Sequence, residues 1–246
     1  MRTLDQARID QVGERLFGDV NGAMTVLNVY LGHRLGFFRA LAESGPTTPA
    51  ELAQETGCAE RYVREWLECM VVNEYLEHEP GLDRFTLPAE HAAVLADAEG
   101  AAFAAPFTCF IPSLAQALPR LIDAFHSGGG VPFEDYGADA REAIGAGNRP
   151  MFVNDYVSKW IAAMPDVAAR LRAGGHVADI GCGVGWSSIS LAVGFPDIRV
   201  DAVEPDAASV AEARAHAVAA GVADRVTFHE ATAALHRLMH QHGIPH

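Results

Sequence analysis

One short stretch limits the possible folds of this chain more than any other. It reads Val-Ala-Asp-Ile-Gly-Cys-Gly-Val-Gly-Trp and covers residues 177–186. Its apolar, β-branched beginning predicts a buried parallel strand. The alternating glycines that follow (Gly181, Gly183 and Gly185) carry no Cβ, so they predict a turn in which a ligand lies against bare backbone. A helix is expected from Trp186 to Val193, with its first N–H groups directed at that ligand.

A second feature is a carboxylate at the end of the next expected strand, which closes on Glu204. A carboxylate at this position is suited to accept hydrogen bonds from both hydroxyls of a ribose. Dinucleotide sites carry their glycines as G-x-G-x-x-G, whereas here Trp186 stands at the third glycine position. The pattern therefore favours another nucleotide-like ligand, while a dinucleotide site or a purely structural turn stays open as the alternative.

Together these residues resemble the cofactor motif of class I methyltransferases that use S-adenosylmethionine (SAM). Alternate glycines with Asp179 two residues ahead of them fit SAM better than NAD. The resemblance implies that Asp179, Gly181, Gly183 and Gly185 line the methionine end of SAM, that Glu204 binds its ribose, and that Cys182 turns its backbone toward it. In this family an acidic residue after the third strand commonly holds the adenine. Thr232 stands there in this chain, and Glu230 lies two residues earlier.

The composition argues against several kinds of partner. A formal net charge of −14 opposes the positive field that nonspecific nucleic-acid or anionic-membrane binding requires. No apolar run approaches the ~18 residues of a membrane span, and the first residues are typical of a cytoplasmic protein. The cysteines form no C-x-x-C pair, so they predict neither a zinc site nor a disulfide framework. His236 and His240 lie one helical turn apart without a carboxylate, so no bound metal is expected.

The first third of the chain has the pattern of a winged helix. Apolar residues predict a helical region over residues 4–44, helices over 50–55 and 59–75, and a hairpin over 76–87. In DNA-binding winged helices the second helix lies in the major groove and needs positive charge. Here that helix carries four glutamates (60, 65, 68 and 74) against Arg61 and Arg64. DNA binding is therefore not expected, and the wide apolar stripe of residues 4–44 predicts burial against something outside its own domain.

The middle of the chain extends the resemblance. Prolines at 106, 112 and 119 are expected to interrupt a helical region over 95–124, and a helix is expected to open near Asp139. The segments G-x-P-F-x-x-Y-G (130–137) and N-R-P-x-F (148–152) look like those of winged-helix methyltransferases that act on small molecules. In such enzymes the winged-helix region dimerises and roofs the partner's active site. The resemblance implies a homodimer and a small-molecule substrate, with Tyr136, Asn148, Phe152 and Tyr156 on the substrate side; interdomain packing is the alternative for each.

The expected fold class is α/β. A mainly helical winged-helix and dimerisation domain (1–98) would be followed by a helical connector on the substrate side (99–172) and a partial Rossmann-like SAM domain (173–246). Only three strands are expected, near Val177, Val200 and Val226, whereas the family sheet has seven. We therefore expect a shortened methyltransferase with reduced or no activity alone, or else a non-catalytic winged-helix protein that dimerises or regulates. No catalytic residue, substrate or methylated atom is predicted.

Overall fold

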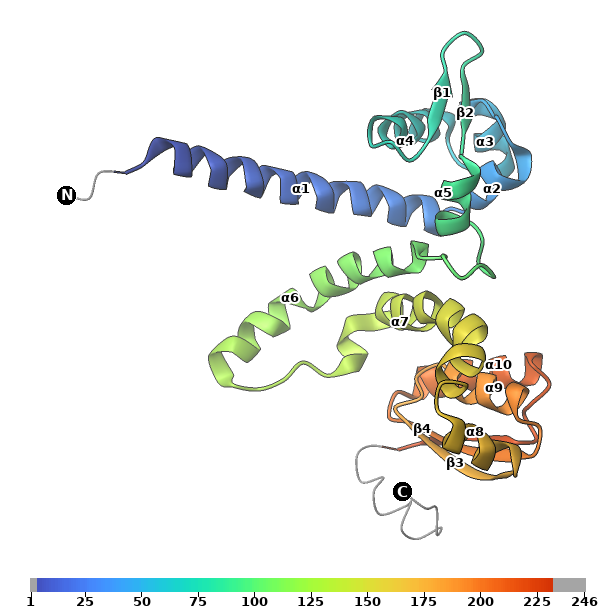
Figure 1. The fold of residues 1–246 in the computed structure, drawn as a ribbon. Helices are drawn as coiled ribbons and strands as arrows, with labels where there is room; N and C mark the ends of the chain where they lie inside the picture. Colours follow the sequence, from blue (N-terminus) through green and yellow to red (C-terminus); the bar gives the residue numbers. More distant parts are fainter. Residues whose placement is uncertain (1–3, 232–246) are drawn as a thin grey trace. The chain divides into compact units, whose positions relative to one another are not determined.

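The computed structural model of the protein describes residues 4–231. The chain divides into two compact units, Met1–Ala115 and Gln116–His246, and each is described by itself. Figure 1 shows the mainly helical first unit, coloured blue to green, and the second unit, whose later part, coloured orange to red, contains a sheet.

The first unit has the winged-helix order that the sequence predicts. Its elements are α1 (Gln6–Arg34), α2 (Phe37–Ser44), α3 (Pro49–Thr56), α4 (Glu60–Val72), β1 (Glu77–Glu79), β2 (Arg84–Thr86), α5 (Ala89–Leu95) and the short 3-10 helix η1 (Ala105–Cys109). The strands β1 and β2 pair antiparallel and form the wing. The large buried side chains of its core come from α2, α3, α4 and β2: Phe38, Leu41, Leu52, Leu67, Met70 and Phe85.

Local sequence sets the helix ends of this unit. The Thr48 side chain accepts from the backbone N–H of Glu51, and the Glu51 carboxylate accepts from that of Thr48, which is a capping box. Gly57, in the left-handed region at φ +68°, ends α3. The helical region expected over residues 4–44 is two helices, because Gly36 takes φ +72° between α1 and α2.

The charged side chains of the wing are engaged within the unit. Arg64 of α4 donates to both carboxylate oxygens of Asp83, at 3.1 and 2.8 Å. Arg84 of β2 donates to both oxygens of Glu51, at 3.2 and 3.3 Å. Arginines held in pairs with carboxylates carry less free positive charge toward a polyanion. This agrees with the electrostatic argument against DNA binding.

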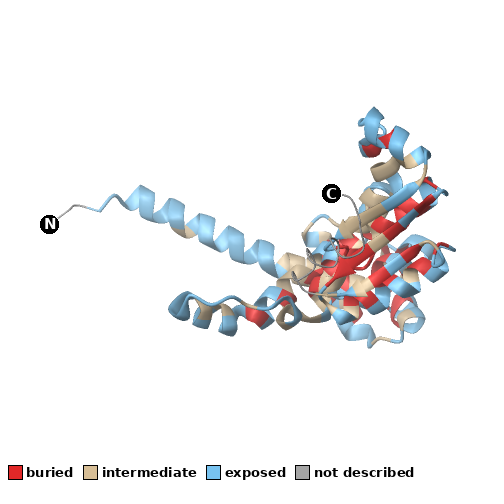
Figure 2. Ribbon diagram, turned by 90° about the horizontal axis from the view of Figure 1, so that it is seen from below, coloured by how far each residue is buried: buried red, intermediate tan, exposed pale blue. Residues whose placement is uncertain are grey.

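Helix α1 leaves much of its apolar surface uncovered within its own unit. Figure 2 shows its N-terminal half mostly in the colour of exposed residues. The exposed apolar side chains of its first 19 residues (6–24) are Ile9, Val12, Leu16, Phe17, Val20 and Met24. Among the residues that the structure describes, no helix combines the length and the apolar character needed to cross a membrane.

The second unit is built around a three-stranded parallel sheet. Its elements are the rest of α6 (Phe110–Ser127), the 3-10 helix η2 (Phe133–Tyr136), α7 (Gly137–Met151), the π-helix η3 (Phe152–Ile161), α8 (Pro165–Arg172), β3 (Gly175–Ile180), α9 (Trp186–Gly194), β4 (Ile198–Glu204), α10 (Ala207–Ala219) and β5 (Val226–Glu230). The strand order is β3-β4-β5. This α/β arrangement confirms the three strands and the partial Rossmann-like sheet expected from the sequence.

The expected proline interruptions are mostly wrong. Pro106 lies at the start of η1, as a helix-initiating residue. Pro112 lies in the first turn of α6, where a backbone N–H has no intrahelical partner to lose. Pro119 lies inside α6 and Pro150 inside α7, yet both helices continue. Directly after Pro150 the chain passes into the wider turns of η3, a change of helix type that accommodates a missing donor.

The sheet buries the face that carries Val200, Ala202 and Phe228 under the helices that follow its strands. In register, Val200 of β4 lies opposite Val177 of β3 and Val226 of β5. Strand β3 pairs with β4 alone among the described strands, and its last residue, Ile180, is 54% exposed. The carboxyl ends of β3 and β4 meet at one edge of the sheet, where the glycines of the sequence motif follow.

Candidate functional site

The glycine turn after β3 is held against the end of β4. The backbone N–H groups of Gly181 and Cys182 both donate to the carbonyl oxygen of Val203, at 2.8 and 3.1 Å. Gly181, Gly183 and Gly185 take φ values of +76°, +53° and +86°, a region that favours glycine. The alternating glycines therefore have a conformational reason, as the sequence predicts.

Asp179 fixes the far end of the turn. Its Oδ2 accepts hydrogen bonds from the hydroxyl groups of Ser187 and Ser188, at 2.5 and 2.6 Å. Both serines lie in the first turn of α9. A carboxylate near a helix N-terminus is also favoured by the helix dipole. The observed contacts of Asp179 therefore join the end of β3 to the start of α9.

Glu204 closes the turn from the neighbouring strand. It is 8% exposed. Its Oε2 accepts from the backbone N–H of Gly183 and its Oε1 from that of Asp206, each at 3.0 Å. A carboxylate oxygen has two acceptor sites, so each oxygen of Glu204 can still accept one further hydrogen bond.

Gly185 is the most tightly enclosed of the three glycines. A Cβ at this position would lie 2.9 Å from the ring of Phe228 and 3.0 Å from the Cβ of Ala213. By contrast, a Cβ on Gly181 or Gly183 would meet no atom within 4 Å. Gly185 thus serves the packing of the turn against β5 and α10, while Gly181 and Gly183 leave open space beside the backbone.

Cys182 is a buried thiol inside the turn. Burial, together with the charges of Asp179 and Glu204, raises the pKa of Cys182 to about 12. The thiol therefore stays protonated near neutral pH, and thiolate is the nucleophilic form. The raised pKa of Cys182 disfavours a role as nucleophile.

A pocket of about 230 Å³ opens beside the turn. It is lined by Phe133, Arg141, Ile144, Gly145, Gly181, Gly183, Val184, Glu204 and Ser209. Typical small-ligand pockets span roughly 300–1,000 Å³, so this one has room for only part of an extended ligand. Gly181, Gly183 and Glu204 of the sequence prediction line it, whereas Asp179, Cys182 and Gly185 support the turn behind it.

Sequence reasoning missed the contribution of α7 to this pocket. Gly145 packs so closely on the turn that a Cβ there would lie 2.5 Å from Cγ2 of Val184. Arg141, one turn earlier, lines the same pocket. A glycine within an otherwise helical segment is the one sequence signal that pointed to this close approach.

An aromatic stack braces the turn from outside the pocket. The guanidinium of Arg149 lies 4.8 Å from the centre of the Trp186 ring. The His216 ring is stacked with Trp186, with centres 4.4 Å apart. Nδ1 of His216 is 3.0 Å from the carbonyl oxygen of Val184. Residues of α7, α9 and α10 thus converge on the glycine turn.

The four residues predicted for the substrate side do not line this pocket. Tyr136 and Asn148 are half-buried on η2 and α7. Phe152 and Tyr156 of η3 make an edge-to-face contact, with ring centres 5.4 Å apart. Burial and the nearby charge of Asp179 raise the pKa of Tyr156. Tyr156 therefore lies within electrostatic range of the end of β3, and its phenol is protonated at neutral pH.

Several sequence predictions fall at or beyond the end of the described chain. Thr232, His236 and His240 lie outside the described residues. Glu230, the last residue of β5, is exposed and pairs in register with Glu204.

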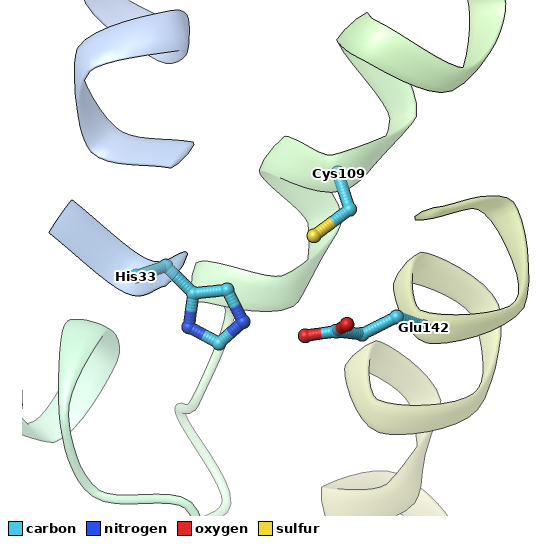
Figure 3. Close-up of side chains that lie close together, drawn as sticks. All are labelled: His33, Cys109 and Glu142. Carbon is cyan, nitrogen blue, oxygen red and sulfur yellow. The ribbon is translucent and has the colours of Figure 1, made fainter. Parts of the chain in front are cut away.

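One further pair of metal-ligating side chains lies in the first unit. A ring nitrogen of His33 on α1 and the Sγ of Cys109 on η1 lie within 4.8 Å of each other. Figure 3 draws both side chains. Glu142, drawn in the same figure, belongs to the second unit. Zinc sites take three or four protein ligands, so the two first-unit side chains alone do not make one.

Comparison with protein families identifies both parts of the chain. Residues 22–97 match the model of the Rv2258c-like winged HTH domain. Residues 177–242 match the model of a methyltransferase domain. The first match covers the winged-helix plan, and the second covers the glycine turn and Glu204.

Solved structures share this fold over most of the chain. The mitomycin 7-O-methyltransferase MmcR is 21% identical, with a TM-score of 0.57, and the match covers 93% of this chain and 68% of MmcR. An assigned O-methyltransferase from Nostoc punctiforme is 19% identical, with a TM-score of 0.64, and the match covers 94% of this chain and 66% of that one.

The O-methyltransferase NcsB1 from neocarzinostatin biosynthesis, solved with SAM and 2-hydroxy-5-methyl naphthoic acid, is 18% identical, with a TM-score of 0.57. That match covers 85% of this chain and 65% of NcsB1. The chain thus spans about two thirds of the length of these relatives. It joins a winged helix-turn-helix domain of the Rv2258c-like family to a methyltransferase domain, and it has the fold of these O-methyltransferases.

Proposed function

We propose that this protein is a SAM-dependent methyltransferase that acts on a small molecule. The observation that carries the proposal is the buried carboxylate of Glu204, which binds the backbone of the glycine turn and lines the pocket beside it. The methyltransferase domain match supports the reaction class. The solved complex of NcsB1 with SAM and a naphthoic acid supports the cofactor and a small substrate.

The residues of the pocket fit SAM. Gly181 and Gly183 leave a cradle that a Cβ would fill, because the space at their Cβ positions is open and both line the pocket. We assign the methionine end of SAM to this cradle. Each oxygen of Glu204 has a free acceptor site, and we assign these to the ribose hydroxyls.

The remaining predicted cofactor residues receive supporting roles in this proposal. The contacts of Asp179 with Ser187 and Ser188 support a role in holding the turn and the start of α9 beside the methionine end. Gly185 and Cys182 keep the turn compact, with the Cys182 backbone toward the cofactor.

SAM supplies a methyl group bound to a positively charged sulfur. The protein's own contribution is to bind and orient, since such transfers depend mainly on alignment of the reacting atoms. We assign no catalytic residue. Tyr136, Asn148, Phe152 and Tyr156 stay proposals for the substrate side; the effect of Asp179 on the pKa of Tyr156 favours Tyr156 among them.

We further propose that the protein is a homodimer that uses α1. Six exposed apolar side chains between Ile9 and Met24 recur at helical spacing, which is typical of a helix that packs against a partner. Nucleic acid is not proposed as a partner, because Arg64 and Arg84 are paired with carboxylates and the net charge is −14. A cytoplasmic location and low turnover by this chain stay predictions of the sequence.

The test is calorimetric titration of the purified chain with SAM, with NAD as the control ligand. We expect micromolar SAM binding, no NAD binding, and loss of SAM binding in Gly183→Arg, whose side chain would enter the cradle. Light scattering on the same sample measures the dimer. A folded dimer that binds no SAM would contradict the proposal and favour a non-catalytic winged-helix protein.

A further inference from the structure

Arg141, which lines the pocket, carries a buried donor that the fold itself does not satisfy. Nε of Arg141 is buried and has no hydrogen-bond partner among the described residues. Its nearest carboxylate oxygens are Oδ2 of Asp206 and Oε1 of Glu212, both at 3.8 Å, beyond hydrogen-bond range. Buried donors are nearly always paired in folded proteins, because an unpaired one costs free energy. An unpaired donor on a residue that lines a pocket therefore points to an acceptor on a ligand that draws this side chain toward the pocket.

The two neighbouring carboxylates, Asp206 and Glu212, do not accept a hydrogen bond from Nε of Arg141. Oδ2 of Asp206 caps α10, accepting from the backbone N–H of Ser209 at 2.9 Å and from its hydroxyl at 2.6 Å. Glu212 is half-exposed at its side chain and lies nearly two turns further along α10 than Asp206. The Arg141 side chain is only 18% exposed, so water has limited access to it.

The charged side chains around the pocket limit which ligand group can accept a hydrogen bond from Arg141. Arg141 is the one basic side chain among the described residues that line the pocket, and it faces Asp206 and Glu212 while Glu204 lines the same space. A carboxylate on the ligand would lie beside Glu204 in the pocket, and Asp206 and Glu212 already offset the charge of Arg141, so like-charge repulsion disfavours it. A neutral hydroxyl oxygen meets no such penalty.

A hydroxyl group on the ligand can also donate a hydrogen bond to Glu204. A ribose hydroxyl that donates its proton to a Glu204 oxygen still has lone pairs that need a donor. We propose that Nε of Arg141 supplies that donor to one of the two ribose hydroxyls, so that Arg141 and Glu204 together recognise the vicinal diol of the cofactor. The inference rests on the proposed function and adds a specificity residue from α7.

The test measures binding of S-adenosylhomocysteine and three analogues by calorimetry. Arg141→Ala is expected to weaken S-adenosylhomocysteine binding roughly tenfold, the size of one charge-assisted hydrogen bond. It should weaken 5′-methylthioadenosine equally, because that ligand keeps the diol and lacks the carboxylate. The 2′-deoxy and 3′-deoxy analogues of S-adenosylhomocysteine each lack one ribose hydroxyl. The effect of the substitution should vanish with the analogue that lacks the hydroxyl contacted by Arg141, and should persist with the other.

Two more variants distinguish a role of Arg141 in ligand binding from a role in holding α7 against α10. Arg141→Lys keeps a positive charge opposite Asp206 and Glu212 but lacks Nε, and it should lose affinity as Arg141→Ala does. Glu212→Gln removes an ion pair of Arg141 and should bind S-adenosylhomocysteine as the wild type does. Circular dichroism checks the fold of each variant, and Arg141→Lys carries the test where Arg141→Ala does not fold.

Two results would overturn the inference. A penalty that disappears with 5′-methylthioadenosine would assign Arg141 to the carboxylate of the methionine end. An equal penalty for all four ligands, shared by Glu212→Gln, would make Arg141 a structural link between α7 and α10. Wild-type protein that binds none of the ligands would instead contradict the proposed function itself.

Discussion

The carboxylate of Glu204 accepts a hydrogen bond from the backbone N–H of Gly183 over 3.0 Å, which joins the end of β4 to the middle of the turn after β3. The same carboxylate lines the pocket. One buried side chain thus holds the shape of the turn and presents acceptors to a ligand. Substituting Glu204 should therefore affect both the shape of the turn and ligand binding.

The first prediction concerns Glu204→Gln. The amide group would place its NH₂ against one of the two backbone donors, Gly183 or Asp206, and would weaken the remaining acceptor. We expect S-adenosylhomocysteine affinity to fall about 10- to 100-fold by calorimetry. Asp166→Asn is the control, because Asp166 is an exposed carboxylate of α8 that does not line the pocket. Equal losses in both variants would contradict the assignment.

The second prediction separates backbone strain from steric packing at Gly185. Both Gly185 and Gly221 take a positive φ, +86° and +69°. A Cβ on Gly185 would collide with Phe228 and Ala213, whereas one on Gly221 would meet nothing within 4 Å. In urea unfolding, Gly221→Ala should lower the free energy of unfolding by about 1 kcal/mol. Gly185→Ala should lower it by roughly 2–4 kcal/mol. Similar values would mean that strain alone matters.

The third prediction tests the contact of α7 with the turn. A Cβ on residue 145 would lie 2.5 Å from Cγ2 of Val184, so Gly145→Ala must move the turn or the helix. We expect a loss of about 1–3 kcal/mol in the free energy of unfolding, as for other overpacked sites, together with weaker S-adenosylhomocysteine binding. Adding Val184→Ala makes room for the new methyl group and should restore part of both. A double variant no better than Gly145→Ala would exclude this contact as the cause.

Local patterns predicted the elements that local sequence controls. The glycine turn and the strand ending on Glu204 follow from dihedral preferences and apolar patterning, and they were found where expected. The expected interruption at Pro119 was wrong, because the tertiary structure tolerates this proline inside α6, where isolated propensities predict a break.

The rest of the pocket depends on contacts between distant segments. Arg141 reaches α10 and the pocket only because α7 packs on the turn through Gly145, and no spacing in the sequence encodes that distance. The same holds for the stack of Trp186 with His216, which joins residues of two helices. Sequence motifs therefore identified Gly181, Gly183 and Glu204 in the pocket lining, while the contribution of Arg141 and Gly145 from α7 required the structure.

The fourth prediction uses the buried thiol as a pH-dependent probe of the turn. Burial, with Asp179 and Glu204 nearby, raises the pKa of Cys182 from 9.0 to about 12. Because the folded pKa lies above the unfolded one, the stability linked to this thiol is fully present below about pH 9 and is lost as pH rises toward 12. The wild-type free energy of unfolding should therefore fall more steeply over this range than that of Cys182→Ala, by up to about 1.4 kcal/mol per pH unit. Val184→Ala, a neighbouring buried change without a titrating group, should keep the wild-type slope; parallel slopes for all three proteins would mean that the thiol ionises freely in the folded state.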